Sequence, residues 1–453
     1  MNLEKTYNKR DFCKKIMLVG AIGPTLTGEV SSSCLPFGAM ALSAFLKERG
    51  INCKVVSTAF PRAAEEIFNA LDDIDLLGIS SMSGPYLNYA ISISIAVKKI
   101  KPELPIVWGG PHASLMDEDL ITNDFVDFVI RGVGEVSLWE LVKALKGESS
   151  FFSVPGLTWI DRGLIKRNGL STDFEINALP PLDYSFLSDK YPFLMTDEFS
   201  YFSSRGCPFE CSYCVASQIY NRRWYNKTEE KVIDELEEAY QKYRFKSVYF
   251  WDDNLFVDIK RLLRILESLN NRDIFFQWSG FARVDTFSRL GRETVAELEK
   301  RGLKWVSFGA ESGSERTLSR IDKGITVDNI KETVLKLKGF NIVCDFSFMG
   351  GMPQETDQDF YDTVNLLRWI KKNNSRSSVR MFRFVLYPKM PMLDDHKEIR
   401  NLLPKNIYGW SKITYQNAKF PWVSSKINRA LTTLSFTSLY SETKRKLSIK
   451  NIL

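Results

Sequence analysis

Two successive runs of alternating strand-like and helix-like segments constrain the fold of this 453-residue chain more than any other feature. In the first run, short β-rich segments alternate with helical segments between residues 14 and 147. Its strands are expected at 15–20, 53–57, 75–80, 105–109 and 128–131. Strands that are each followed by a helix form a parallel sheet covered by helices on both faces. We therefore predict a doubly wound α/β domain over residues 1–150.

The second run of alternation begins near residue 196. Its strands are expected at 198–203, 247–251, 275–279, 305–309, 343–349 and 381–386. The helix predicted at 229–243 has the clearest apolar stripe, which includes Val232, Leu236 and Tyr240. Six strand–helix units favour a partial, TIM-like (β/α)6 barrel over residues 196–395. Such barrels carry their chemistry at the carboxyl ends of the strands.

The remaining segments are less regular. Residues 151–195 read as a connector that contains a hairpin-like stretch at 156–166, and residues 396–453 read as a small helical cap. The net charge of +6 is spread along the chain, so no nucleic-acid partner is expected. No apolar stretch is long enough to span a membrane. Seven cysteines are too few and too unevenly spaced for a disulfide framework. Since neither a disulfide framework nor a membrane span is predicted, we expect a cytoplasmic protein without a membrane partner.

Three cysteines, Cys207, Cys211 and Cys214, crowd into eight residues directly after the first strand of the second run. Three thiolates on one loop can each bind one iron of a [4Fe–4S] cube and leave the fourth iron without a protein ligand. An open iron can bind a substrate. The alternative is a zinc site, which normally needs a fourth ligand nearby. The only histidines, His112 and His396, are far away in sequence, so we favour the cluster.

The spacing C-x-x-x-C-x-x-C, with an aromatic residue before the last cysteine, resembles the radical S-adenosylmethionine superfamily. The resemblance covers nearly all of residues 196–395. It implies that the acidic pair after the second barrel strand holds the methionine amino group. It also implies that the motifs after the fourth and fifth strands lie near the ribose and the adenosine. The implied S-adenosylmethionine residues are Tyr213, Asp252, Asp253, Arg283, Glu311, Ser312, Gly350 and Gly351.

Each of these motifs also has a simpler interpretation. Asp252 and Asp253 could cap a helix, Glu311 could begin a surface turn, and the two glycines could form a plain loop. Their order, each motif after its own strand, favours the cofactor interpretation. One departure is residues 387–392, which stand where the family often has proline–glycine–threonine, so substrate contacts there are not implied.

Residues 14–147 resemble the cobalamin-binding domain that precedes the barrel in one branch of this superfamily. The resemblance rests on the loops at 81–83, 109–112 and 132–135, whose small residues let the backbone approach a large, flat corrin. The implied cobalamin residues are Ser81, Ser83, Gly109, Gly110, His112, Gly132, Gly134 and Glu135. The alternative is a flavodoxin-like domain that binds a nucleotide or nothing.

The first domain departs from one cobalamin motif. Residues 33–38 stand where many such domains have a histidine that coordinates cobalt, and Leu35 occupies the histidine position. Leucine cannot ligate cobalt. The resemblance then implies a corrin whose lower face lacks a histidine ligand. His112 would contact the nucleotide tail or its surroundings, or it could be an ordinary surface histidine.

Together these resemblances imply a cobalamin-dependent radical S-adenosylmethionine enzyme, with methyl transfer as its first expected reaction. The cluster would reduce S-adenosylmethionine to release a 5′-deoxyadenosyl radical, and methylcobalamin would deliver methyl to an unactivated carbon of a small molecule. An external donor such as flavodoxin or ferredoxin would supply the electron. The alternatives are cyclisation, oxidation or rearrangement with the same cofactors, a first domain that has lost cobalamin, and a non-catalytic cobalamin or iron–sulfur sensor.

Overall fold

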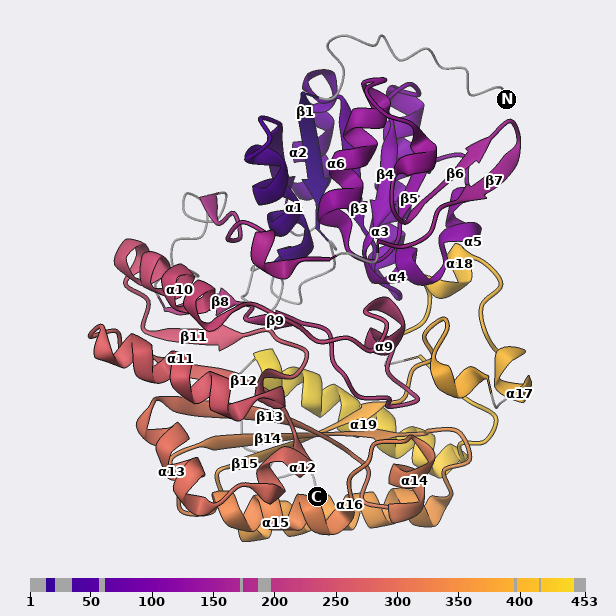
Figure 1. Cartoon of the computed structure of the whole chain (residues 1–453). Helices are drawn as coiled ribbons and strands as arrows, with labels where there is room; N and C mark the ends of the chain where they lie inside the picture. Colours follow the sequence, from indigo (N-terminus) through magenta and orange to yellow (C-terminus); the bar gives the residue numbers. More distant parts are fainter. Residues whose placement is uncertain are drawn as a thin grey trace. The chain divides into compact units, whose positions relative to one another are not determined.

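The computed structural model describes residues 14–20, 35–56, 62–171, 174–185, 197–394, 397–414 and 417–443. The chain divides into two compact units (Figure 1). Unit 1 comprises residues 1–195, 218–220 and 403–413, and unit 2 comprises the rest.

Unit 1 is built on a seven-stranded sheet in the order β2-β1-β3-β4-β5-β6-β7. The first five strands run parallel: β1 (Lys15–Val19), β2 (Asn52–Val56), β3 (Leu76–Ser80), β4 (Ile106–Gly109) and β5 (Phe128–Ile130). The strands β6 (Leu157–Asp161) and β7 (Leu164–Arg167) are antiparallel. The predicted parallel sheet is confirmed. The strand order reverses between β1 and β3, which is where ligands bind in such sheets.

Helices cover both faces of this sheet. On one face, α1 (Phe37–Lys47) and α6 (Gly134–Leu145) pack on Ile16 and Leu18. On the other face, α2 (Arg62–Asn69) and α3 (Tyr86–Ile100) pack on Met17 and Val19. Two short helices, α4 (Gly110–Leu115) and α5 (Asp117–Ile121), follow β4. Burial on both faces explains why these strands read as continuous apolar runs, and the doubly wound architecture is confirmed.

Two segments of unit 1 were predicted from the sequence to lie outside the first domain. The hairpin expected within the connector is present as β6 and β7, but it extends the sheet. Residues 403–413, expected in the helical cap, belong to unit 1, where Ile407 and Trp410 of α18 (Ile407–Trp410) are buried in the core. A segment so short and so distant in sequence carries no local signal of where it packs.

Unit 2 is built on a six-stranded sheet in the order β15-β14-β13-β12-β11-β8, in which every neighbouring pair is parallel. The strands are β8 (Glu198–Tyr201), β11 (Ser247–Phe250), β12 (Gln277–Arg283), β13 (Leu303–Glu311), β14 (Val343–Gly350) and β15 (Ser377–Arg383). Strands β8 and β15 form the two edges, so the barrel is open, and the predicted partial barrel is confirmed. A register irregularity between Gly309 and Glu311 lets β13 run two residues past its predicted end.

Helices follow the strands of unit 2, and the predicted helix at 229–243 is confirmed. The helices are α10 (Glu229–Tyr243), α11 (Ile259–Asn271), α12 (Val284–Arg289), α13 (Arg292–Lys300), α14 (Glu315–Arg320), α15 (Val327–Leu337), α16 (Asp357–Asn373) and α19 (Ser425–Thr443). Shorter elements are β9 (Ser204–Arg205), which pairs with β10 (Tyr225–Asn226), α9 (Ala216–Ile219) and α17 (Lys397–Arg400). One face of the sheet is fully buried, as Phe250, Phe308 and Phe346 show, which is the face that helices cover. Among the described residues, no helix has the length and apolar character needed to cross a membrane.

Candidate functional site

The cysteine loop leaves β8 and is held at its start by two carboxylates from the end of β11. Asp252 is fully buried and accepts hydrogen bonds from the Ser203 backbone N–H at 3.0 Å, from the Ser203 hydroxyl at 2.7 Å and from the Ser204 hydroxyl. Asp253 accepts the Gly206 N–H at 2.8 Å. Both aspartates therefore lie at the predicted strand end, but the structure shows them bound to the loop itself. The carboxylate of Asp252 is surrounded by protein donors.

The three cysteines of the loop are free thiols, with Cys211 buried and Cys207 and Cys214 half-buried. Burial raises the pKa of Cys207, and it raises the pKa of Cys214 to about 11. Iron that binds here must displace the thiol protons, as metals do at cysteine sites. Among the described residues, no group of three His, Cys, Asp or Glu side chains is arranged around a single metal ion. A cubic cluster does not require that arrangement, because each cysteine binds a different iron.

Arg283, at the end of β12, lies against the cysteine loop. Its Nη1 lies 3.5 Å from the Cys211 sulfur, and its guanidinium is stacked over the Phe209 ring at 3.8 Å from the ring centroid. Its Nε donates to Asp285 at 2.9 Å. The guanidinium therefore places a positive charge next to the Cys211 sulfur. The structure brings Arg283, predicted as an S-adenosylmethionine residue, to Cys211, which is predicted as a cluster ligand.

Tyr213 of the loop forms a polar group with Glu311 and Lys323, in which Glu311 and Lys323 are buried and Tyr213 is half-buried. The Tyr213 hydroxyl donates to Glu311 Oε1 at 2.8 Å, and Lys323 Nζ donates to the Tyr213 oxygen and to Glu311 Oε1, both at 2.9 Å. Burial, and then the charge of Glu311, raises the pKa of Tyr213 well above its ordinary value, so the phenol remains a donor. The sequence predicted Tyr213 and Glu311 but not Lys323, since a lone lysine after a short helix carries no pattern.

The other predicted residues of unit 2 shape the loops around this group. Ser312 is fully buried and its hydroxyl lies 3.1 Å from that of Thr363 on α16, which fixes the loop after β13. Gly351, with a φ of +84°, donates its N–H to Glu355, and its carbonyl accepts from Trp422 Nε1 at 3.1 Å. A Cβ on Gly350 would lie 2.7 Å from Leu431 of α19. The glycine turn after β14 is thus packed against the C-terminal segment.

In unit 1, the loops after β3 and β4 are tied together. The Ser81 hydroxyl donates to the Gly109 carbonyl at 2.9 Å and accepts the Ala113 N–H at 3.1 Å. Gly110 has a φ of +87°, and a Cβ there would lie 2.8 Å from Ser80 Oγ and 3.0 Å from the Ser81 backbone. Only glycine fits this close approach of two strand ends.

The third strand end joins the same edge of the sheet. The Ser114 hydroxyl donates to the Gly110 carbonyl at 2.9 Å and accepts the Gly132 N–H at 2.9 Å. Gly134 and the buried Glu135 begin α6. Gly109 is the least crowded of these glycines, since a Cβ there would meet only a carbonyl at 3.8 Å among the described residues.

His112 lies beneath this edge. Its side chain is fully buried, its Nδ1 lies 2.8 Å from the Ser83 hydroxyl, and its ring is edge-on to Trp410. Nε2 has no hydrogen-bond partner among the described residues. Burial lowers the pKa of His112 to about 4. The alternative of a surface histidine is therefore wrong. Leu35 is also buried, whereas Ser33 and Cys34 of the same motif lie outside the described residues.

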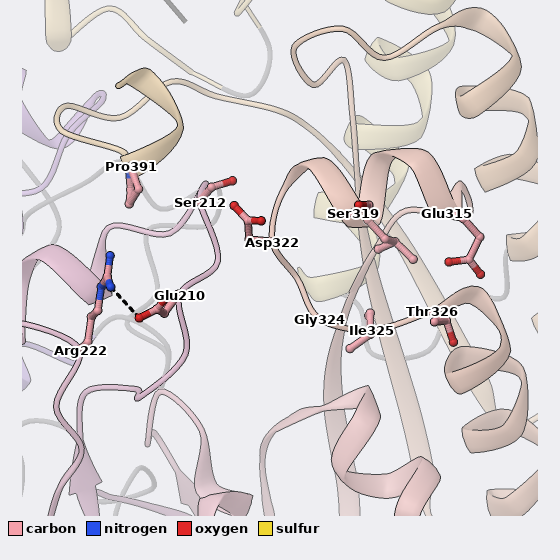
Figure 2. A pocket seen from close by; sticks show the side chains of 11 residues that line it. Glu210, Ser212, Arg222, Glu315, Ser319, Asp322, Gly324, Ile325, Thr326 and Pro391 are labelled. Carbon is pink, nitrogen blue, oxygen red and sulfur yellow. Dashed lines mark hydrogen bonds and ion pairs between the residues drawn. The ribbon is translucent and has the colours of Figure 1, made fainter. Parts of the chain in front are cut away.

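A cavity of about 770 Å³ lies beside the cysteine loop. Figure 2 shows Glu210, Ser212 and Arg222 on one side and residues of α14 and the following turn on the other. Arg222 pairs with Glu210 at 2.6 Å. Ser212, between two of the cysteines, is buried, and its hydroxyl has no hydrogen-bond partner in the described part of the chain. Pro391 brings the 387–392 loop to this cavity, which we call the loop groove.

Two protein-family models match the chain. Residues 201–367 match the model of the radical SAM superfamily, and residues 23–142 match the model of the B12 binding domain. The two matches cover the two sets of candidate residues described above. The cofactors that these domains imply are a [4Fe–4S] cluster, S-adenosylmethionine and cobalamin, which confirms the predicted set.

Curated relatives include an uncharacterised methyltransferase of Pyrococcus horikoshii, 30% identical over 305 residues, with 65% of this chain and 64% of the relative covered. An anaerobic magnesium-protoporphyrin IX monomethyl ester cyclase of Rubrivivax gelatinosus is 24% identical, with 72% of this chain and 58% of the relative covered. The chain thus spans less than two thirds of the length of these relatives.

Among solved structures, the radical S-adenosylmethionine methyltransferase TsrM from Kitasatospora setae matches with a TM-score of 0.68 and 16% identity, covering 85% of this chain and 76% of TsrM. The cobalamin-dependent enzyme OxsB matches with a TM-score of 0.68 and 19% identity, covering 86% of this chain and 62% of OxsB. These likenesses support the fold of both units. The chain therefore carries a radical SAM domain over residues 201–367, preceded by a B12 binding domain over residues 23–142.

Proposed function

We propose that the protein is a cobalamin-dependent radical S-adenosylmethionine methyltransferase that acts on an unactivated carbon of a small molecule. The observation that supports this most directly is the cysteine loop. Its three thiols follow the first strand of an open barrel, and Arg283 donates to one of them. Tyr213 of the same loop is bound to the buried Glu311 and Lys323.

In this proposal, Cys207, Cys211 and Cys214 hold the cluster, and the edge formed by Ser81, Gly109 and Gly132 holds cobalamin. When bound, the cluster supplies the electron that cleaves S-adenosylmethionine, and cobalamin supplies the methyl group. The residues of the chain bind and orient these groups. Asp252 and Asp253 are positioning residues, since their hydrogen bonds go to the start of the loop.

The binding of S-adenosylmethionine would rest on polar groups at the ends of β13 and β14. Glu311 offers a carboxylate that Tyr213 and Lys323 hold in place. Gly351 turns the backbone after β14 with a positive φ, and the half-buried Glu355 fixes that turn. Cobalamin would bind without a histidine ligand, because Leu35 is apolar and His112 is buried.

The remaining parts of the proposal concern partners and location. An external electron donor such as flavodoxin or ferredoxin would reduce the cluster. The loop groove, whose lining includes the two neighbours of Cys211, Glu210 and Ser212, is the candidate route of access. The free cysteines of the described residues suit a reducing compartment, so we place the protein in the cytoplasm.

A second candidate is ring formation with the same cofactors. It is favoured by the three anaerobic magnesium-protoporphyrin IX monomethyl ester cyclases among the relatives, which are 21% to 25% identical to this chain. The site described above does not separate this reaction from methyl transfer, because both reactions would use the same cofactor residues.

Anaerobic reconstitution with iron, sulfide and cobalamin tests the proposal. We expect about four irons for three cysteines, stoichiometric corrin with a base-off spectrum, and formation of 5′-deoxyadenosine and S-adenosylhomocysteine under reducing conditions. A protein that binds iron but does not retain cobalamin would rule out the methyl-transfer mechanism through cobalamin. Zinc in place of iron, unaffected by anaerobic handling, would overturn the proposal as a whole.

A further inference from the structure

Lys323 is the centre of the contacts between the cysteine loop and the end of β13. Its ammonium donates to Tyr213 of the loop and to Glu311 of the strand, and its backbone carbonyl accepts from Arg283. Lys323 and Glu311 are both more than nine-tenths buried. The lysine lies in the turn after α14, which contacts the loop again where Ser212 donates its N–H to the Ile321 carbonyl at 3.0 Å.

The hydrogen bonds to Glu311 are one-sided. Those from Tyr213 and from Lys323 both end on Oε1, at 2.8 and 2.9 Å. Oε2 accepts none from the described residues. A buried carboxylate with one oxygen held by a phenol and an ammonium has its other oxygen fixed in direction and ready to accept a hydrogen bond.

The backbone at this point is adapted to the pair. Glu311 has a left-handed φ of +63°, a conformation that few residues other than glycine adopt. Gly309 leaves the space that the pair occupies, because a Cβ there would lie 2.4 Å from Glu311 Oε1 and 3.0 Å from Lys323 Nζ. The register irregularity of β13 falls between these two residues. Strain at a buried charged pair indicates a functional position more than a purely structural one.

We infer that Lys323 is a positioning residue for S-adenosylmethionine, which holds Oε1 of Glu311 against Tyr213 and so presents Oε2 to a hydroxyl or ammonium donor of that ligand. The inference rests on the proposed function. It adds a residue that contacts the cluster loop and the binding carboxylate at once, so that ligand binding depends on a side chain outside the recognised motifs.

The test measures S-adenosylmethionine binding by equilibrium dialysis to the reconstituted, oxidised protein, together with iron content and the cluster absorption spectrum. In K323M and in E311Q we expect the dissociation constant to rise about 10- to 100-fold, the size expected for a charge-assisted hydrogen bond. Iron content and spectrum should match the wild type. K331M removes a lysine of α15 whose one ion pair within the described part of the chain is with the exposed Asp328; it is the matched control and should bind normally.

The double variant K323M/E311Q decides whether the two residues act together. If Lys323 acts through Glu311, replacing Lys323 changes the affinity for S-adenosylmethionine little in a protein that already lacks the Glu311 carboxylate. The losses of affinity in the two single variants then do not add in the double variant. G309A provides an independent test, because it keeps both charges and displaces the pair. We expect it to weaken binding as well.

Three results would overturn the inference: K323M with wild-type affinity, additive losses in the double variant, or loss of iron in K323M while E311Q and G309A bind normally. These results differ from failure of the proposed function, which would appear as a wild-type protein that holds a cluster but does not bind S-adenosylmethionine.

Discussion

Asp252 accepts both the backbone N–H and the hydroxyl of Ser203, at 3.0 and 2.7 Å, and so ties the end of β11 to the start of the cysteine loop. The carboxylate is completely buried and lies 49 residues away in sequence. The loop that carries Cys207, Cys211 and Cys214 is therefore held by a contact that belongs to the barrel.

This contact predicts that D252A destabilises unit 2 by about 3 kcal/mol or more, since several hydrogen bonds to one buried charged acceptor are lost. Denaturant unfolding and the iron content after reconstitution measure the effect. D253A removes one hydrogen bond from an exposed side chain and is the matched comparison. Equal losses of stability and iron in the two variants would contradict the role of Asp252 as the main anchor of the cysteine loop.

The three loop cysteines should be individually essential for the cluster. C207S, C211S and C214S are each expected to lose most of the iron and the absorption of the reconstituted protein, because each thiolate holds a different iron. C344A, which removes a buried thiol on β14, should retain the cluster. Undiminished iron in any of the three loop variants would argue against a three-cysteine cluster.

Two neighbouring glycines should separate folding from cobalamin binding. G110A is expected to destabilise unit 1 by about 2 kcal/mol or more, because alanine is strained at a φ of +87° and its Cβ would collide with the Ser81 backbone. G109A has an extended φ of −141° and free space, so it should fold normally. We expect G109A to retain less cobalamin, as corrin absorbance after gel filtration would show. Normal retention by G109A would place the corrin elsewhere.

The buried His112 predicts a pH dependence. Its pKa falls from 6.5 to about 4 on folding, so the unfolded chain binds a proton that the folded chain lacks. Its stabilising contribution is complete above pH 6.5 and is lost as the pH falls toward 4, by about 3 kcal/mol in total. Unfolding midpoints of the wild type and H112Q between pH 4 and 8 test this. A slope that H112Q leaves unchanged would contradict it.

Much of the architecture was predictable because its signals are local. Alternation of strand and helix patterns is set by which neighbouring residues are apolar, and it placed the doubly wound sheet and the open barrel. Strand ends were less predictable: β15 begins four residues before its expected start, and β13 runs on to Glu311. Those limits depend on pairing with the adjacent strand, which no single segment encodes.

The candidate site divides in the same way. The cysteine spacing, the acidic pair and the glycine loops are short motifs, and their residues lie at the strand ends where they were expected. The roles of Asp252 and Arg283, which bind the cysteine loop, follow from contacts across the barrel. Those contacts form only after the strands have paired.

The residues without any motif depended wholly on folding. Lys323 meets Tyr213 across 110 positions of sequence, and Trp410 packs near His112 from the far end of the chain. A lone lysine and a lone tryptophan look like a surface charge and an ordinary core residue until the fold surrounds them. Local patterns determine which elements form, whereas the burial and pairing of single side chains depend on how those elements pack.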